Sequence, residues 1–400
     1  MYNNTYLKKV GVTNLKIYKA YRFRIYPTKE QKYKLNSFLG SSRFIYNNYL
    51  SKKEQMYKEE NKTYLLKDMK KDLVNLQAKY PWLKEVDGCI LRTSLEDLDR
   101  AYDNFFKGRG GYPNYKKKNH NESYRTVCIK STYKEKEYSN IKVDLERRVI
   151  KLPKLDEIPI RGYRNLKSFP YKIFNATVTK EASRYYVSVC VQEEIKEVTL
   201  APRYFIGIDI GVKTLVTCSD GIKYDKIKEI EVQERRIKGL QKALSRTKLG
   251  SNNRKKLIQK IQRAYQKIRN MRKYYIHTIT TKLVKENDVI TAETLKVKDM
   301  IEKGKNHLSK HIANASFSEI IRQLGYKSKW NGKKFYQINT YYPSSQTCSH
   351  CDYKETSLKD LSIRKWECKA CGFINDRDLN ASINIMNKGI DMYIKEQYGN

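Results

Sequence analysis

The segment YFIGIDIGVKTLVTCSDGIKYD, residues 204–225, contains a nearly continuous apolar strand, a glycine turn and a second strand. The composition shifts at Pro202, just before it, so we expect a new domain to begin there. Asp209 stands in the middle of the first strand, where an ionised carboxylate is costly unless it is paired or holds a metal ion. The segment therefore predicts a strand-led domain that carries a functional acid.

Two further acids occupy comparable positions. Glu293 ends the apolar stretch VITAE, and Asp378 precedes the helical run NASINIM. Each acid alone could be a turn former, a strand-end charge or a helix N-cap. Together with Asp209, these acids could hold two Mg²⁺ ions about 4 Å apart across a phosphate, as a two-metal phosphodiesterase requires. Asp376 could be a ligand, a partner of a ligand or a solvated charge, and we prefer Asp378.

A second candidate metal site is local in the sequence. Cys348, Cys351, Cys368 and Cys371 form two Cys-x2-Cys pairs separated by sixteen residues. Four thiolates at this spacing predict a closed, structural Zn²⁺ site, in preference to disulfides or a redox pair. His350 is not expected to be a ligand. The remaining cysteines, at 89, 128, 190 and 218, are expected to be reduced packing residues.

The charge of the chain points to a polyanionic partner. Lys and Arg number 82 against 43 Asp and Glu, which gives a net charge of +39. A nucleic acid would offset this charge, although a generally basic, solubilising surface is the alternative. Candidate phosphate contacts are Lys116, Lys117 and Lys118 in one segment and Arg254, Lys255 and Lys256 in another. A basic helix face is often simply solvated, so the second group is the less specific of the two.

The rest of the chain suggests alternating strands and helices. Residues 17–27 predict a strand, the following region to about 106 is helical in pattern, and 122–198 consists of short alternating strands that form an antiparallel sheet or barrel. Residues 232–286 predict two helices. No segment is apolar enough for a signal peptide or a membrane span, so we expect a cytoplasmic protein without a membrane partner.

Several segments resemble the TnpB proteins, which are transposon-encoded RNA-guided nucleases similar to compact type V CRISPR effectors. The most specific are LEDLDRAYDNFFKGRGGYPNYKKK, GIDIGVKTL, YYPSSQTCSHC and CKACGFINDRDLNASINI, and they occur in the family's order. The resemblance implies that Asp209, Glu293 and Asp378 are catalytic and that the four cysteines bind zinc. Two small departures are Asp352 and Ser382, where Gly and Ala are common in the family.

The resemblance also implies a mixed α/β fold, in which a RuvC domain of the RNase H type carries a zinc-ribbon insertion and follows a wedge β-barrel interrupted by a helical recognition lobe. The expected boundaries are 1–30 and 121–200 for the barrel, 31–120 for the lobe, 201–342 and 376–400 for RuvC, with a helical insertion at about 232–286, and 343–375 for the ribbon.

The function that follows from the resemblance is RNA-guided, Mg²⁺-dependent cleavage of double-stranded DNA. The guide RNA would come from the parent transposon, and the target would carry a short adjacent motif. The alternatives are a nuclease-inactive RNA-guided repressor, which the intact acids disfavour, and a transposase that joins DNA ends. We expect a monomer in preference to a dimer. We also expect the protein to be associated with the nucleoid of a prokaryote.

Overall fold

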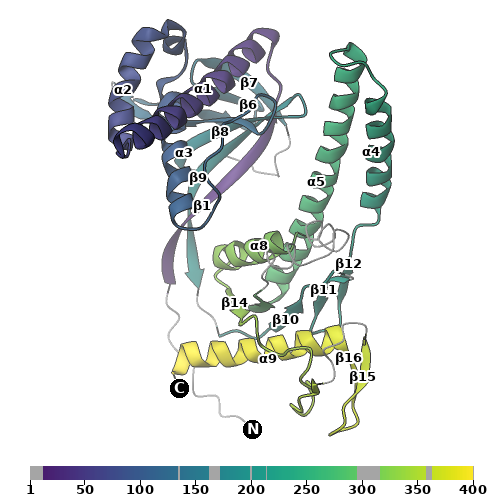
Figure 1. Ribbon diagram of the computed structural model, residues 1–400. Coiled ribbons are helices and arrows are strands. Elements are labelled where there is room, and N and C mark those ends of the chain that lie inside the picture. The colour runs from purple at the N-terminus through teal and green to yellow at the C-terminus, as the bar shows by residue number, and fades with distance from the viewer. Residues whose placement is uncertain are drawn as a thin grey trace. The chain divides into compact units, whose positions relative to one another are not determined.

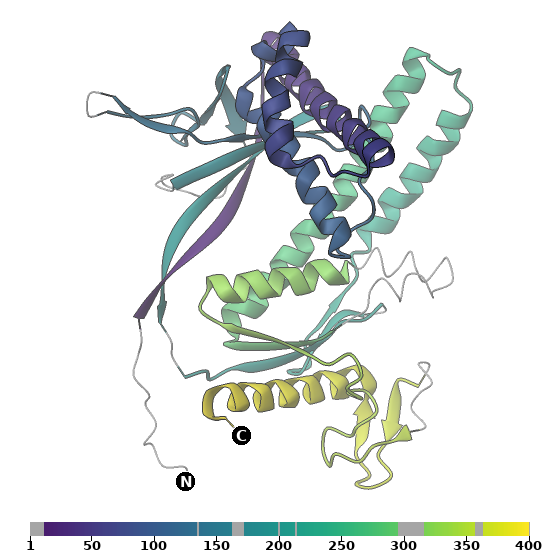
Figure 2. The same cartoon turned by 60° about the vertical axis from the view of Figure 1, so that its left-hand side comes forward.

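The computed structural model describes residues 12–133, 136–161, 172–198, 201–212, 214–294, 316–356 and 363–399. The chain divides into two compact units, one of Lys16–Glu194 and one of Ile195–Asn400 together with Met1–Leu15. Figures 1 and 2 show the elements of each unit. His307 and His311, which the sequence suggests are ordinary loop or helix residues, lie outside the described residues.

The unit of Lys16–Glu194 contains a seven-stranded sheet of order β2-β8-β9-β1-β7-β6-β5. The predicted N-terminal strand is β1, and it lies inside this sheet, where Ile25 is paired with Ile160 of β7. The strands of the unit, including the separate β3–β4 hairpin, are β1 Val12–Ile25, β2 Glu122–Val127, β3 Lys130–Tyr133, β4 Lys136–Ser139, β5 Lys142–Asp144, β6 Val149–Leu152, β7 Leu155–Arg161, β8 Lys172–Glu181 and β9 Arg184–Val198.

Helices are inserted between β1 and β2, as the sequence predicts. They are α1 Lys29–Glu60, α2 Leu66–Lys79, the 3-10 helix η1 Pro81–Glu85 and α3 Gly88–Phe106. A capping box starts α1: the Thr28 hydroxyl accepts from the Gln31 N–H, and the Gln31 side chain accepts from the Thr28 N–H. One apolar core joins α1 and α3 to the sheet, so the helices and strands of this unit depend on each other.

The second unit is built on a five-stranded sheet of order β12-β11-β10-β13-β14. Strands β10, β11 and β12 are antiparallel neighbours, whereas β13 and β14 run parallel to β10. An antiparallel meander followed by two parallel strands is the sheet of the RNase H fold, so the predicted fold class is confirmed. The strands are β10 Phe205–Asp209, β11 Thr214–Cys218, β12 Lys223–Asp225, β13 Val289–Glu293 and β14 Lys334–Ile338.

Helices cover both faces of this sheet. The antiparallel pair α4 Glu229–Ser245 and α5 Asn252–Glu286 is the predicted two-helix region, and the C-terminal half of α5 packs with α8 Phe317–Trp330 on one face. Helix α9, Arg377–Tyr398, covers the opposite face (Figures 1 and 2). A small hairpin of β15 Lys365–Glu367 and β16 Ile374–Asp376 precedes α9.

Two glycines allow α9 to lie unusually close to the sheet. A Cβ on Gly207 of β10 would stand 2.1 Å from the backbone oxygen of Ser382. A Cβ on Gly389 of α9 would stand 1.8 Å from Oγ1 of Thr291 on β13. Because neither strand nor helix can accept a larger residue here without moving, these close contacts fix the position of α9 and of the acid at its start.

Candidate active site and cysteine cluster

The three predicted acids lie at the ends of elements of the RNase H-like sheet. Asp209 is the last residue of β10, whereas the sequence analysis placed it in the middle of a longer strand. The strand ends earlier because the chain turns at Gly211, whose N–H donates to the Leu215 carbonyl. Glu293 is the last residue of the parallel neighbour β13. Asp378 lies in the first turn of α9. Carboxyl ends of adjacent parallel strands meet at one sheet edge, which is where α/β folds hold ligands.

The charges of Glu293 and Asp378 act on the buried Asp209 carboxyl. Burial, together with the charges of Glu293 and Asp378, raises the pKa of Asp209 to about 7. Burial likewise raises the pKa of Glu293, against a hydrogen bond from the Ser344 hydroxyl. Burial disfavours the ionised forms of Asp209 and Glu293, and a bound divalent cation would stabilise those charges. This edge of the sheet is therefore suited to a metal ion.

Asp376 and Asp378 have different partners. Asp376 is the N-cap of α9, accepting from the N–H groups of Asp378 and Leu379, and its other oxygen lies 2.9 Å from Nζ of Lys223. Asp378 instead accepts from Nη1 of Arg364 at 3.0 Å. The helix cap uses the Asp376 carboxylate, which supports the preference for Asp378.

Polar side chains near the acids support them, and the contacts of Ser344 and Asn384 were not predicted from sequence. Ser344 donates to Oε1 of Glu293. Asn380 and Asn384 of α9 are buried, and both donate to the carbonyls of Ser344 and Thr347. Asn380 also accepts from the Ser349 N–H, so it orients nearby backbone. The i, i+4 spacing of the two asparagines on an apolar helix was the available signal.

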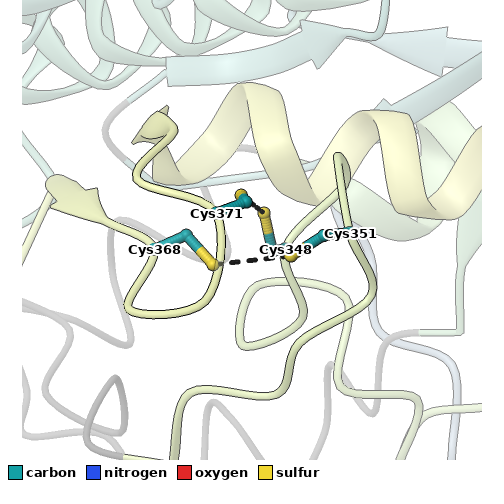
Figure 3. A group of neighbouring side chains, drawn as sticks. All are labelled: Cys348, Cys351, Cys368 and Cys371. Atoms are coloured by element: carbon teal, nitrogen blue, oxygen red, sulfur yellow. Dashed lines mark hydrogen bonds between the residues drawn. The ribbon is translucent and has the colours of Figure 1, made fainter.

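The four cysteines of the predicted zinc site converge (Figure 3). Their sulfurs all lie within 4.8 Å of one another, with 3.8 Å between Cys348 and Cys371 and 3.6 Å between Cys351 and Cys368. Zn–S bonds of about 2.3 Å in a tetrahedron imply sulfur separations of about 3.8 Å. In the described part of the chain, these cysteines are the group of possible ligands whose atoms lie close enough together to bind one ion. His350 stacks on Phe373 instead of joining the group.

The two cysteine turns match each other closely. Asp352 N–H bonds the Cys348 carbonyl at 2.9 Å, and Gly372 N–H bonds the Cys368 carbonyl at 2.8 Å. Both residues have positive φ, 61° for Asp352 and 70° for Gly372. The family departure at Asp352 therefore places a side chain where the backbone favours glycine, a position that Asp tolerates better than most residues. None of the eight cysteines, all of which lie in the described ranges, forms a disulfide.

The predicted phosphate contacts are not equivalent. Lys116 lies with Nζ 4.0 Å from the centre of the Tyr46 ring, and burial lowers its pKa, whereas Lys117 and Lys118 are exposed. Arg254 donates to the Leu244 carbonyl at 3.1 Å, and its neighbours Lys255 and Lys256 are exposed. One member of each group thus contributes to internal structure, and two face outward.

Comparison with known proteins begins with three family models. Residues 188–304 match OrfB_IS605, described as "Probable transposase", and residues 317–385 match the "Cas12f1-like, TNB domain". Residues 17–62 match a "Helix-turn-helix domain". In the structure, that last range holds strand β1 and the single helix α1 instead of two helices.

Whole-chain comparisons cover nearly the full length. The chain is 30% identical over 390 residues to "Putative RNA-guided DNA endonuclease InsQ" of Escherichia coli K12, covering 94% of this chain and 93% of that protein. It is 31% identical over 378 residues to "Putative RNA-guided DNA endonuclease" of Streptomyces pristinaespiralis, covering 93% and 89%. The solved "Cas12f1-sgRNA-target DNA complex" contains a similar fold, with a TM-score of 0.56, 12% identity and coverage of 94% and 99%.

The sheet and its surrounding helices place this chain among proteins with an RNase H-like nuclease fold carrying a TNB-type cysteine domain. The chain belongs to the TnpB, or OrfB_IS605, family. The resemblance noted in the sequence is therefore confirmed. In the described part of the chain, every helix is too short or too polar to cross a membrane.

Proposed function

We propose that the chain is an RNA-guided DNA endonuclease whose Asp209, Glu293 and Asp378 hold two Mg²⁺ ions. The observation that carries the proposal is that Asp209 and Glu293 end the neighbouring parallel strands β10 and β13. At this edge of the sheet, burial and the charges of Glu293 and Asp378 raise the pKa of Asp209. Full-length similarity to proteins named RNA-guided DNA endonucleases supports it. When bound, the ions would supply an activated water and stabilise the leaving oxygen of the cleaved phosphodiester.

The side chains around the acids have separate tasks in this proposal. Ser344 fixes one oxygen of Glu293, which leaves the other oxygen for a metal ion. Arg364 neutralises Asp378 in the absence of metal, so metal binding must compete with this ion pair. Asp376 holds the start of α9 and thereby positions Asp378 without binding the ion.

The cysteine cluster is proposed to hold one structural Zn²⁺. Its four thiolates complete a tetrahedron, so no position remains for water or substrate, and the ion stabilises the fold without taking part in cleavage. Asn375 donates to the Cys348 sulfur at 3.6 Å, the kind of outer contact that orients a metal-bound thiolate.

The partners follow from charge and family together. A net charge of +39 suits a protein that holds a guide RNA and its DNA target through their phosphates, with specificity supplied by base pairing. We infer that the exposed Lys117, Lys118, Lys255 and Lys256 are among the phosphate contacts. A target motif next to the paired region is part of the same proposal.

The test is cleavage of a plasmid library by the chain co-expressed with the RNA encoded beside its gene. Cutting that requires the RNA and Mg²⁺, and that is lost in Asp209→Asn, is the expected result. Asp378→Asn should also abolish cutting, whereas the matched variant Asp376→Asn should retain it, because an Asn side chain still caps α9 and keeps Asp378 in position. RNA-dependent binding without cutting would support the repressor alternative, and joined DNA ends would support a transposase; either outcome would overturn the proposal.

A further inference from the structure

A group of aromatic rings is exposed at the C-terminal end of α3. Phe106 is 76% exposed, Tyr112 46% and Phe105 36%. The rings support one another: Tyr102 stacks on Phe106 with centroids 6.2 Å apart, and Phe105 meets Tyr112 edge-on at 5.4 Å. We call Tyr102, Phe105, Phe106 and Tyr112 the ring cluster. Large apolar groups that gather on a surface, instead of being scattered singly, usually mark a binding site.

The loop beside the ring cluster is held in place by several contacts. Asn47 of α1 makes two hydrogen bonds with the backbone of Lys116, at 3.0 and 2.8 Å. The Tyr115 hydroxyl donates to Glu54 at 2.8 Å, and the Tyr102 and Tyr112 hydroxyls lie 3.0 Å apart. Because the rings and the loop are already ordered, little conformational entropy remains to be lost when a partner binds.

The surroundings of the ring cluster are basic. Lys107 is paired with Asp103 at 2.7 Å, while Arg109, Lys117 and Lys118 are exposed on the same loop. Exposed rings beside cations are complementary to a partner that presents flat apolar faces and negative charge together. Single-stranded nucleic acid has both features, whereas a duplex hides the faces of its bases inside the stack.

We propose that the ring cluster is a stacking surface for unpaired bases of the guide RNA, with Lys117 and Lys118 on the adjacent phosphates. The assignment to RNA rests on the proposed function, because the guide is the nucleic acid that such a protein carries before it meets a target. A surface already ordered in the chain alone suits this permanent partner. Stacking tolerates any base, so the ring cluster would bind RNA without reading its sequence.

The first test measures binding of the full-length chain to a fluorescent twelve-nucleotide oligoadenylate RNA over a range of salt concentrations. Phe106→Ala and Phe106→Leu should weaken binding by about 5- to 100-fold, and Phe106→Trp should preserve it, since only an aromatic ring stacks on a base. The salt dependence should not change, because phosphate contacts remain. The matched control is Tyr33→Ala, which removes a ring that is 77% exposed on α1, and it should bind normally.

The second test identifies the nucleic acid in the assembled complex. A photoreactive benzophenone amino acid at position 106 should crosslink to the RNA that copurifies with the chain, before any DNA is added, and the same amino acid at position 33 should not. Crosslinking only after target DNA is supplied would overturn the assignment to RNA. Oligoadenylate affinity unchanged in Phe106→Ala would overturn the stacking surface itself, and neither result depends on whether the chain cleaves DNA.

Discussion

The cysteine cluster and the acidic sheet edge are two candidate metal sites built in opposite ways. The cysteines come from two matched turns within residues 348–371, and their sulfurs already have the separations of a tetrahedral site. The acids span residues 209–378 and depend on a sheet and a helix to bring them together. The geometry of a local site is set by its own turns. The geometry of a distributed site is set by the packing of the core, and its buried acids repel one another.

The largest effect is expected when the local site loses its metal. Cys371→Ser should remove the zinc and unfold the segment around β15 and β16, because the described residues of that segment form a small core of Cys348, Trp366 and Cys368. Structural zinc contributes on the order of 10 kcal/mol to such segments. Metal analysis should find one zinc per chain in the native protein and none in the variant.

The matched control for zinc loss is Cys190→Ser, which changes a free cysteine outside the cluster. It should keep one zinc per chain and the native thermal stability. Full zinc content in Cys371→Ser would show that the four sulfurs are not jointly required.

The next effect concerns the packing that builds the distributed site. Gly207→Ala should displace α9 from β10, because the new Cβ would lie 2.1 Å from the Ser382 oxygen. Overpacking of this kind costs about 1–3 kcal/mol, and moving Asp378 away from Asp209 should reduce cleavage as well. Thermal unfolding and cleavage rate measure the two consequences.

Gly239→Ala in α4 serves as the matched glycine change, since a Cβ there would meet nothing within 4 Å. It should raise stability by about 0.5–1 kcal/mol through helix propensity and leave cleavage unaltered. Equal stability changes in the two variants would contradict the close helix–sheet contact.

A pH-dependent effect tests the burial of Asp209 and its repulsion by Glu293 and Asp378. The pKa of Asp209 is raised to about 7 in the folded chain, from 3.8 in an ordinary carboxyl. Below both pKa values the Asp209 carboxyl is neutral in the folded and the unfolded chain and does not change the free energy of unfolding. Between about pH 4 and 7 the folded chain keeps a proton that the unfolded chain releases, so the free energy of unfolding falls as the pH rises. In Mg²⁺-free buffer, Asp209→Asn should therefore become more stable than wild type by a few kcal/mol at pH 8, with little difference at pH 4.

Asp376→Asn should show the reverse dependence. Although burial opposes it, the bonds from Lys223 and the α9 backbone lower the pKa of Asp376, so its stabilising contribution is present above about pH 4 and is lost in acid. Urea unfolding of both variants at several pH values checks the signs. If the stabilities of Asp209→Asn and Asp376→Asn changed with pH in the same direction, the pKa of Asp209 would not be raised in the folded chain.

Much of this fold could be predicted from sequence, and the exceptions have physical causes. The apolar strand at Asp209 and the cysteine spacing are local signals, and they predicted β10 and the convergence of the four cysteines. The roles of Ser344 and Arg364 were missed because their partners, Glu293 and Asp378, come from other elements. The internal contacts of Lys116 and Arg254 were not predicted, because sequence does not show which way a basic side chain points.

The smallest effect is expected from the one mismatch between the two cysteine turns. Asp352 adopts the positive φ that Gly372 adopts in the other turn, and a side chain is disfavoured there. Asp352→Gly should stabilise the zinc-bound turn by about 0.5 kcal/mol, seen as a roughly twofold higher zinc affinity in chelator competition. Asp352→Ala should weaken zinc binding, since Ala tolerates this φ less well than Asp, and Gly372→Ala should weaken it further. If Asp352→Ala instead improves binding as much as Asp352→Gly does, the negative charge of Asp352 and not its backbone conformation limits the local site, and the two metal sites would then share the electrostatic repulsion that otherwise distinguishes them.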